Sequence, residues 1–143
     1  LQEYINVCNQ YFATPVIELK WTCKDAEVEQ MNKIFLTSKR QPIVISFREK
    51  PLIKLRQINS KIGIQYIMRE GITESALRDA RVYGFQLSVS SAYVNQKTID
   101  DLHKQGIKIA VWDITSEQIM RQYVGWKADY ITTEEISWAT KTL

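Results

Sequence analysis

Histidine is nearly absent from this sequence, and glycine and cysteine are scarce. The 143 residues include one histidine, five glycines and two cysteines. The glycines form neither a G-x-G-x-x-G nor a G-x-x-x-x-G-K loop, and no G-x-S-x-G elbow occurs. These absences argue against nucleotide binding through a glycine-rich phosphate loop and against a serine hydrolase of the elbow type.

The single histidine, His103, falls in a predicted helix beside the apolar Leu102. A histidine in that setting is more often a packing residue or a helix-end contact than a catalyst. The sequence therefore offers no histidine in a position suited to acid–base catalysis.

Charge of one sign and long apolar runs are also lacking. Nineteen lysines and arginines are interspersed with 16 acidic residues, which leaves a net charge of +3. This balance does not indicate a nucleic-acid partner or an anionic membrane surface. No apolar run approaches the roughly 18 residues of a membrane span, so we expect no transmembrane segment. The sequence opens at Leu1 within a helical pattern, and we expect a fragment or processed chain whose compartment, cytoplasmic or exported, stays open.

The two cysteines, Cys8 and Cys23, fit neither a disulfide framework nor a metal-binding knuckle. Cys8 lies on the apolar stripe of the first predicted helix, which favours a buried thiol. A disulfide between the two cysteines remains open if the protein is exported.

Six apolar segments have the character of strands, and helical patterns separate them. We predict strands at 15–21, 42–47, 62–68, 85–89, 107–114 and 128–133, and a short last helix at 134–143. Thr115 and Gln118 have capping-box spacing before the helix that follows the fifth strand. The alternation predicts one α/β domain over residues 1–143, with a parallel sheet covered by helices. It fits both an open doubly wound sheet and part of a (β/α)8 barrel, since a complete barrel takes about 250 residues.

Both architectures bind ligands at the carboxyl ends of their strands. At the first such end, Glu18 and Lys20 stand two residues apart, and this spacing places both side chains on one face of a strand. Charged groups in an apolar strand are seldom buried unless they are paired or hold a ligand. An exposed edge strand with a polar face, or a simple ion pair between the two, explains the same pattern.

Four segments resemble, in order and spacing, the glycerophosphodiester phosphodiesterases. They are PVIELK at 15–20, IVISF at 43–47, GIKIAVWDI at 106–114 and ADYITT at 128–133, and the resemblance covers essentially the whole chain. It implies a (β/α)8 barrel, of which this chain holds the last six of eight β/α units. It also implies metal-assisted hydrolysis of a small-molecule glycerophosphodiester to glycerol 3-phosphate and an alcohol, in lipid and glycerol metabolism.

The resemblance also implies roles for individual residues. Glu18 would be a ligand of a divalent cation, Mg²⁺ or Ca²⁺, and Lys20 a catalytic group that neutralises the phosphate. Trp112 would line the pocket for the alcohol or glycerol moiety, although core filling explains a tryptophan there almost as well. The remaining candidates for substrate binding at the rim are Ser46, Phe47, Ser88 and Thr133.

The departures from the family are as informative as the matches. The family's His-Arg-Gly strand, its E-x-D strand and its His-Asp pair do not occur in this sequence. Asp113 follows the tryptophan where threonine is common, and the 85–89 strand matches weakly, so the headgroup stays open. We therefore expect the isolated chain to be inactive.

Two other functional classes stay open. The chain fits a non-catalytic truncated barrel that acts in binding or assembly, because an open sheet edge favours self-association or a covering partner. An unrelated six-strand doubly wound domain is a third interpretation, and the lack of a glycine-rich turn or an acidic cluster at the first strands counts against it.

Overall fold

The computed structural model describes residues 1–142. Contacts between Cα atoms divide the chain into two compact units, Leu1–Ile67 and a second that begins at Met68. The prediction of a single domain over residues 1–143 stays a prediction, and each unit is described by itself.

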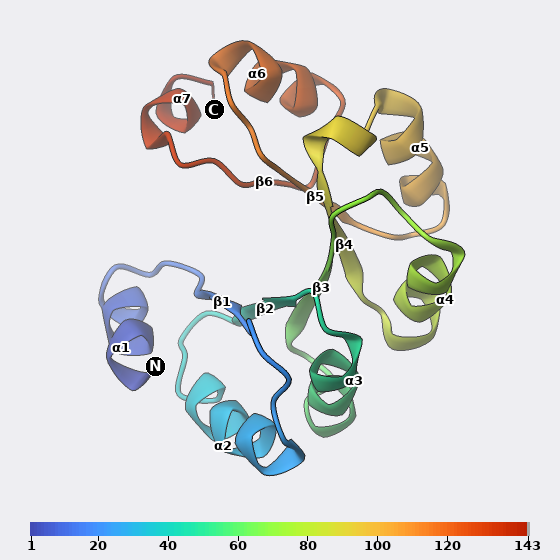
Figure 1. The fold of residues 1–143 in the computed structure, drawn as a ribbon. Helices are drawn as coiled ribbons and strands as arrows, with labels where there is room; N and C mark the ends of the chain where they lie inside the picture. Colours follow the sequence, from blue (N-terminus) through green and yellow to red (C-terminus); the bar gives the residue numbers. More distant parts are fainter. Residues whose placement is uncertain (143) are drawn as a thin grey trace. The chain divides into compact units, whose positions relative to one another are not determined.

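Unit 1 alternates three helices with three parallel strands (Figure 1). Strand β1 pairs with β2, and β2 pairs with β3, with Val16 opposite Ile43 and Ile43 opposite Gly63. Helices α2 and α3 lie side by side along these strands. The elements are α1 (Gln2–Gln10), β1 (Val16–Glu18), α2 (Asp25–Phe35), β2 (Ile43–Ser46), α3 (Glu49–Ile58) and β3 (Gly63–Met68).

Unit 2 continues the same alternation. Strand β5 lies between β4 and β6 and is parallel to both. The elements are α4 (Glu74–Tyr83), β4 (Gln86–Ser90), the 3₁₀ turn η1 (Ser91–Tyr93), α5 (Gln96–Lys104), β5 (Ile109–Trp112), α6 (Glu117–Gly125), β6 (Tyr130–Ile131) and α7 (Ile136–Thr142). All six predicted strands are therefore present, each shorter than or offset from its predicted range. The predicted last helix at 134–143 includes Leu143, which lies outside the described residues.

Buried aliphatic side chains of the strands and of the helix faces toward them form the cores of the units. Residues 87–90 of β4 and Ile109, Ala110 and Val111 of β5 are all buried, as expected for parallel strands covered on both faces. In unit 1 the fully buried side chains include Val44, Leu52 and Ile64.

Polar side chains define several helix ends. Thr73 accepts a hydrogen bond from the Ala76 N–H at the start of α4, and Gly84 ends that helix with φ +65°. The predicted capping box at Thr115 and Gln118 is wrong. Ser116, one residue later, is the N-cap of α6 and accepts from the Ile119 N–H at 3.2 Å.

None of the helices within residues 1–142 combines the length and apolar character that a bilayer crossing requires. Cys8 and Cys23 are separate buried thiols, and no disulfide joins them in this structure.

Tyr123 of α6 forms hydrogen bonds to the segment that follows β4. Its hydroxyl lies 2.8 Å from the carbonyl oxygen of Ser91 and 2.9 Å from that of Val94, and it donates its one hydrogen to this pair. The ring is buried and meets Trp126 edge to face. Burial raises the pKa of the Tyr123 phenol. Because the neutral form is the one favoured in the folded state, this contribution to stability is present at neutral pH and is lost as pH rises through the raised pKa.

Replacing Tyr123 with phenylalanine tests the contribution of these hydrogen bonds to stability. We expect Tyr123→Phe to lower the free energy of unfolding by about 1 kcal/mol, because the carbonyl groups of Ser91 and Val94 lose their donor while the ring is retained. Urea denaturation followed by circular dichroism measures the change. Tyr11→Phe, at a ring that is 72% exposed, is the matched control and should change stability by less than about 0.5 kcal/mol. Equal effects of the two substitutions would contradict the assignment.

Candidate functional site

Glu18 and Lys20 lie at the carboxyl end of β1, and both are exposed. The strand ends at Glu18, so Lys20 belongs to the loop that follows. Among the described residues, no ion pair joins the two side chains. The two side chains are therefore neither buried nor, within the described part of the chain, paired with each other, and their roles as metal ligand and phosphate-binding group stay predictions.

Ser46 holds the peptide between these two residues in place. Its fully buried hydroxyl donates to the Leu19 carbonyl oxygen at 2.7 Å and accepts from the Arg48 N–H at 3.0 Å. The Leu19 N–H in turn donates to the Ile45 carbonyl oxygen at 2.9 Å. Leu19 is thus fixed through both of its backbone groups, and its side chain is buried. Ser46 can therefore act by positioning Glu18 and Lys20.

The other strand-end candidates in unit 1 and in β4 occupy different environments. Phe47 is half-buried just after β2. Ser88 is 5% exposed and lies in the middle of β4, because that strand continues to Ser90. The residue at the end of β4 is Ser90, whose hydroxyl lies 3.5 Å from the Asp113 carboxylate.

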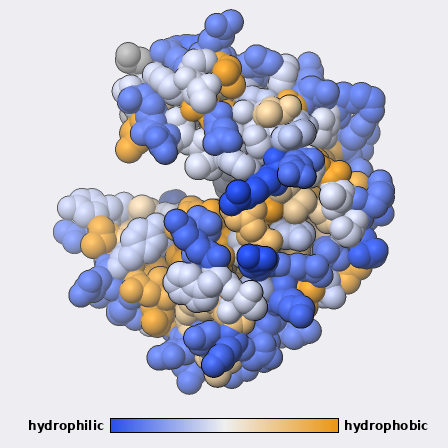
Figure 2. All heavy atoms as spheres, viewed as in Figure 1, coloured by the Kyte–Doolittle hydropathy of each residue, from blue (hydrophilic) through white to orange (hydrophobic). Residues whose placement is uncertain are grey.

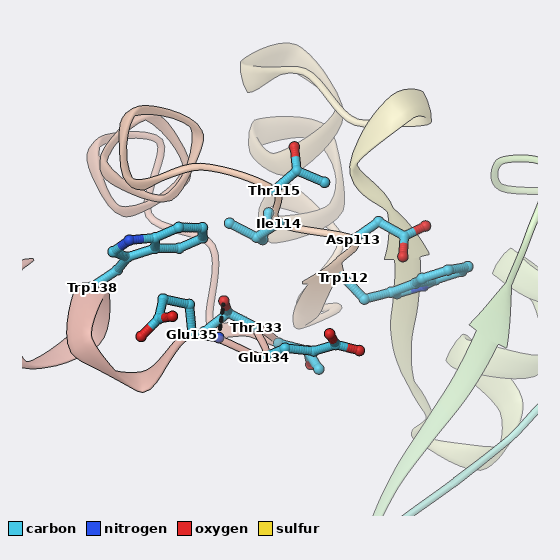
Figure 3. Close-up of a pocket in the computed structure, with 9 residues that line it drawn as sticks. Trp112, Asp113, Ile114, Thr115, Thr133, Glu134, Glu135 and Trp138 are labelled. Carbon is cyan, nitrogen blue, oxygen red and sulfur yellow. Dashed lines mark hydrogen bonds between the residues drawn. The ribbon is translucent and has the colours of Figure 1, made fainter.

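Trp112 and Thr133 come together at the carboxyl ends of β5 and β6. They line a cavity of about 740 Å³, a volume typical of a small-molecule site. The lining side chains come from the ends of these two strands and from the start of α7 (Figure 3). The full lining consists of Trp112, Asp113, Ile114, Thr115, Thr132, Thr133, Glu134, Glu135 and Trp138.

Sequence reasoning missed the part of this cavity that follows β6. Glu134, Glu135 and Trp138 fall in the segment that was expected only to close the chain. Glu135 is held locally, since its N–H donates to the Thr133 hydroxyl at 3.1 Å and its carboxylate accepts from the Ser137 N–H at 3.2 Å. The available signal in the sequence was a pair of acidic residues directly after the predicted strand at 128–133, followed by a tryptophan.

Asp113 has a left-handed backbone, with φ +60°. Non-glycine residues adopt this conformation rarely, although aspartate tolerates it better than most. Its carbonyl oxygen accepts from the Ser91 hydroxyl at 3.1 Å, which ties the ends of β4 and β5 together. Such conformations concentrate at functional sites.

His103 lies away from the strand ends that carry these candidates. Its Nε2 is 2.9 Å from the Asp129 carboxylate, and the same carboxylate oxygen accepts from the Ile109 N–H at 2.9 Å. Ile109 begins β5, whereas Trp112 ends it. The histidine is therefore a helix-end contact at the amino end of β5, as predicted.

The described residues do not fit a divalent cation by themselves. No group of three or more histidine, cysteine, aspartate or glutamate side chains within the described part of the chain could hold a metal ion. Glu18 belongs to no such group among the described residues, and its role as a metal ligand stays a prediction.

Comparison with solved structures identifies the fold. A phosphodiesterase from Oleispira antarctica, solved with the product sn-glycerol-3-phosphate, matches 99% of this chain with a TM-score of 0.84 and 15% sequence identity. A glycerophosphodiester phosphodiesterase from Parabacteroides distasonis matches 99% with a TM-score of 0.80 and 15% identity. A protein from Galdieria sulphuraria, described as a glycerophosphodiester phosphodiesterase, matches 99% of this chain with a TM-score of 0.85 and 14% sequence identity.

This chain spans 58%, 62% and 62% of the lengths of those three structures. Comparisons with models of protein families and with curated protein sequences give no match. The prediction of six units of a (β/α)8 barrel is confirmed, and the chain has the fold of the corresponding part of the glycerophosphodiester phosphodiesterases.

The hydroxyl of Ser46 gives a stability test. We expect Ser46→Ala to lower the free energy of unfolding by about 1 to 3 kcal/mol, because the buried Leu19 carbonyl loses its side-chain donor. Chemical denaturation measures the effect, with Ser60→Ala at an exposed serine as the control. A Ser46→Ala protein as stable as the control would show that the hydroxyl does not hold this peptide.

Proposed function

We propose that this chain is part of a phosphodiesterase that acts on glycerophosphodiesters. The observation that supports it best is the match to phosphodiesterase structures over 99% of the chain, one of them holding sn-glycerol-3-phosphate. The exposed pair at the end of β1 supports it further, since the carboxyl ends of strands are where barrels place their chemistry.

In this proposal Lys20 contacts the phosphate and Glu18 supplies one carboxylate toward a divalent cation. A lysine ammonium is a suitable partner for phosphate, because it carries a compact positive charge and three donors. Ser46 keeps Lys20 in place through Leu19. The ring of Trp112 contacts the alcohol or glycerol moiety, and Phe47 and Thr133 remain candidates near strand ends. Ser88, which lies inside β4, remains a candidate only as a residue behind the strand end.

Binding of sn-glycerol 3-phosphate to the chain tests the role of Lys20. We expect Lys20→Met to weaken binding roughly ten- to a hundredfold, since a charge-assisted hydrogen bond to phosphate is lost. Isothermal titration calorimetry measures the affinity. Lys61→Met removes an exposed lysine just before β3, at the opposite ends of the strands, and is the control. No binding by the unaltered chain, or equal affinity of the two variants, would contradict the proposal.

We expect no hydrolysis of a glycerophosphodiester by the 143-residue chain alone. The only histidine of the sequence, His103, forms a hydrogen bond with Asp129 at the amino end of β5. The described residues also contain no group of three or more histidine, cysteine, aspartate or glutamate side chains that could hold a metal ion. Release of glycerol 3-phosphate is measured with Mg²⁺ or Ca²⁺ added. Turnover that survives purification to homogeneity and is abolished by Glu18→Gln would show that the chain is active by itself.

The alternative of a binding or assembly module rests on the surface of unit 1. Apolar side chains (orange) reach the surface among hydrophilic neighbours (Figure 2). Tyr11, Phe12 and Trp21 are each at least 65% exposed, and Val7 is 53% exposed. Exposed apolar groups of this kind favour association with another protein surface.

Light scattering across a range of protein concentrations tests this alternative. If unit 1 mediates self-association, the mass should rise with concentration, and Val7→Glu should suppress the rise because a charge is placed in the apolar surface. Val82→Glu, at a 66% exposed valine of unit 2, is the matched control. A constant monomer mass would exclude self-association at the concentrations used.

A further inference from the structure

Unit 1 separates its charges between the two ends of its strands. Its acidic residues lie at the end of β1 or in the first two turns of a helix, and residues 30–48 and 50–67 contain neither aspartate nor glutamate. Five basic residues occupy the opposite end, in the last turns of α2 and α3 and in the loops before β2 and β3: Lys33, Lys39, Arg40, Arg56 and Lys61. The amino ends of these strands therefore carry a local positive charge that the net charge of +3 does not reveal.

Four of these cations are available to a partner. All except Arg56 are exposed, and within the described part of the chain none of those four forms an ion pair. Arg56 differs, because its guanidinium donates to the Ser60 carbonyl oxygen at 2.6 Å. Like charges without acidic neighbours repel one another, and an anionic partner removes that repulsion.

Large apolar side chains project among these cations. Tyr11, Phe12 and Leu36 are each at least 65% exposed. The Lys39 ammonium lies 5.2 Å from the centre of the Phe12 ring, and Leu36 and Lys61 line the same depression of about 260 Å³. Cations and apolar groups are thus interleaved on one surface, which we call the basic face. The basic face consists of Tyr11, Phe12, Leu36, Lys39, Arg40 and Lys61.

The backbone of Phe12 has the left-handed conformation, with φ +53°. This residue follows the end of α1, where glycine is the residue that adopts such a conformation without strain. A bulky side chain at positive φ is an outlier and costs stability. Because the ring is exposed, core packing does not offset that cost, and the strain indicates a use for the ring at the surface.

Side-chain hydrogen bonds hold the loops of the basic face in place. The Asn9 side chain accepts from the Lys39 N–H at 2.7 Å and donates to the Thr37 carbonyl oxygen at 3.0 Å. The Asn59 side chain accepts from the Lys61 N–H at 3.2 Å. These lysines therefore project from fixed backbone, which reduces the entropy that is lost when a partner binds.

The mixture of side chains distinguishes among anionic partners. A protein interface has an apolar core inside a polar rim, whereas the Lys39 ammonium lies directly over the Phe12 ring. A nucleic-acid strand stacks its bases on aromatic rings, a contact that the exposed Leu36 cannot make. The surface of an anionic bilayer accommodates all three kinds of side chain, because aromatic rings lie at the headgroups, aliphatic groups reach the acyl chains and cations contact anionic lipids.

We propose that the basic face docks on the surface of a bilayer that contains anionic phospholipids. Its lysines and arginine contact the lipid headgroups, and Phe12 and Leu36 enter the boundary between headgroups and acyl chains. The proposal does not rest on the phosphodiesterase function, because Glu18 and Lys20 lie at the opposite ends of the strands of unit 1.

Vesicle binding measures the docking. The unaltered chain is mixed with vesicles of phosphatidylcholine alone or of equal parts phosphatidylcholine and phosphatidylglycerol, and the bound fraction is determined by sedimentation. We expect partitioning onto the anionic vesicles to be roughly tenfold stronger, and high salt to remove most of this advantage because it screens exposed charges. Equal partitioning onto the two kinds of vesicle would overturn the proposal.

Two double variants with the same change in net charge locate the contact. Lys39→Gln combined with Arg40→Gln removes two cations of the basic face and should weaken partitioning roughly five- to thirtyfold. Lys24→Gln combined with Lys50→Gln removes two exposed lysines near the starts of α2 and α3, and should change partitioning less than about twofold because these positions lie at the other end of unit 1. Equal losses in the two double variants would show attraction by net charge alone and would overturn the assignment to this face.

Apolar variants separate binding from folding. Phe12→Gly relieves the strained backbone and should raise the midpoint of urea denaturation, while loss of the ring should weaken partitioning roughly threefold or more. Leu36→Ser should weaken partitioning by a similar factor, and Val82→Ser, at a similarly exposed residue of unit 2, should leave it unchanged. Unchanged partitioning in both Phe12→Gly and Leu36→Ser would show that neither side chain enters the bilayer and would overturn the proposal.

Polyglutamate and a single-stranded oligonucleotide test the other anionic occupants. Binding of either polymer that is lost in the Lys39→Gln and Arg40→Gln double variant, without binding of anionic vesicles, would assign the face to a protein or a nucleic acid and overturn the bilayer proposal. Vesicle binding that depends on both the cations and the apolar side chains of the face is the result expected.

Discussion

Parallel strand pairing is the constraint on which the rest of this structure depends. Two successive parallel strands cannot be joined by a tight turn, so the chain must return along a helix before each new strand. The strands of unit 1 and those of unit 2 both obey this rule. Within each unit it brings the carboxyl ends of neighbouring strands to one edge. For that reason the Ser46 hydroxyl reaches the backbone carbonyl of Leu19, and Trp112 and Thr133 line one cavity, although the residues of each pair are distant in sequence.

The pattern of apolar segments was enough to predict the order and type of the elements. It failed at their ends, where local polar contacts decide the structure. Ser116 rather than Thr115 caps α6, and β4 continues to Ser90 because serine hydroxyls do not prevent strand pairing. These choices depend on single hydrogen bonds that no periodicity contains.

The candidate site was predictable only in part. Trp112 and Thr133 were identified from their positions at strand ends, and the structure places both in one cavity. Trp138 was missed because its place in the cavity depends on how α7 follows β6, which the helical pattern does not specify. Ser46 was identified, but its backbone contacts could not be, since they require the register of β1 against β2. The negative charge of the cavity likewise emerges only when the fold brings Asp113 to the same cavity as Glu134 and Glu135, which lie more than 20 positions later in the chain.

The separate thiols described above have a consequence for following the protein in solution. Both cysteines of the sequence lie in unit 1, at Cys8 of α1 and at Cys23 before α2, and each is less than a tenth exposed. Burial raises the pKa of the Cys23 thiol, so the reactive thiolate is scarce while unit 1 stays closed. The rate at which a thiol reagent modifies the native chain therefore reports how often unit 1 opens locally. Unit 2 has no cysteine in its sequence and contributes nothing to that signal, so the chain already contains a label that reads the stability of one unit alone.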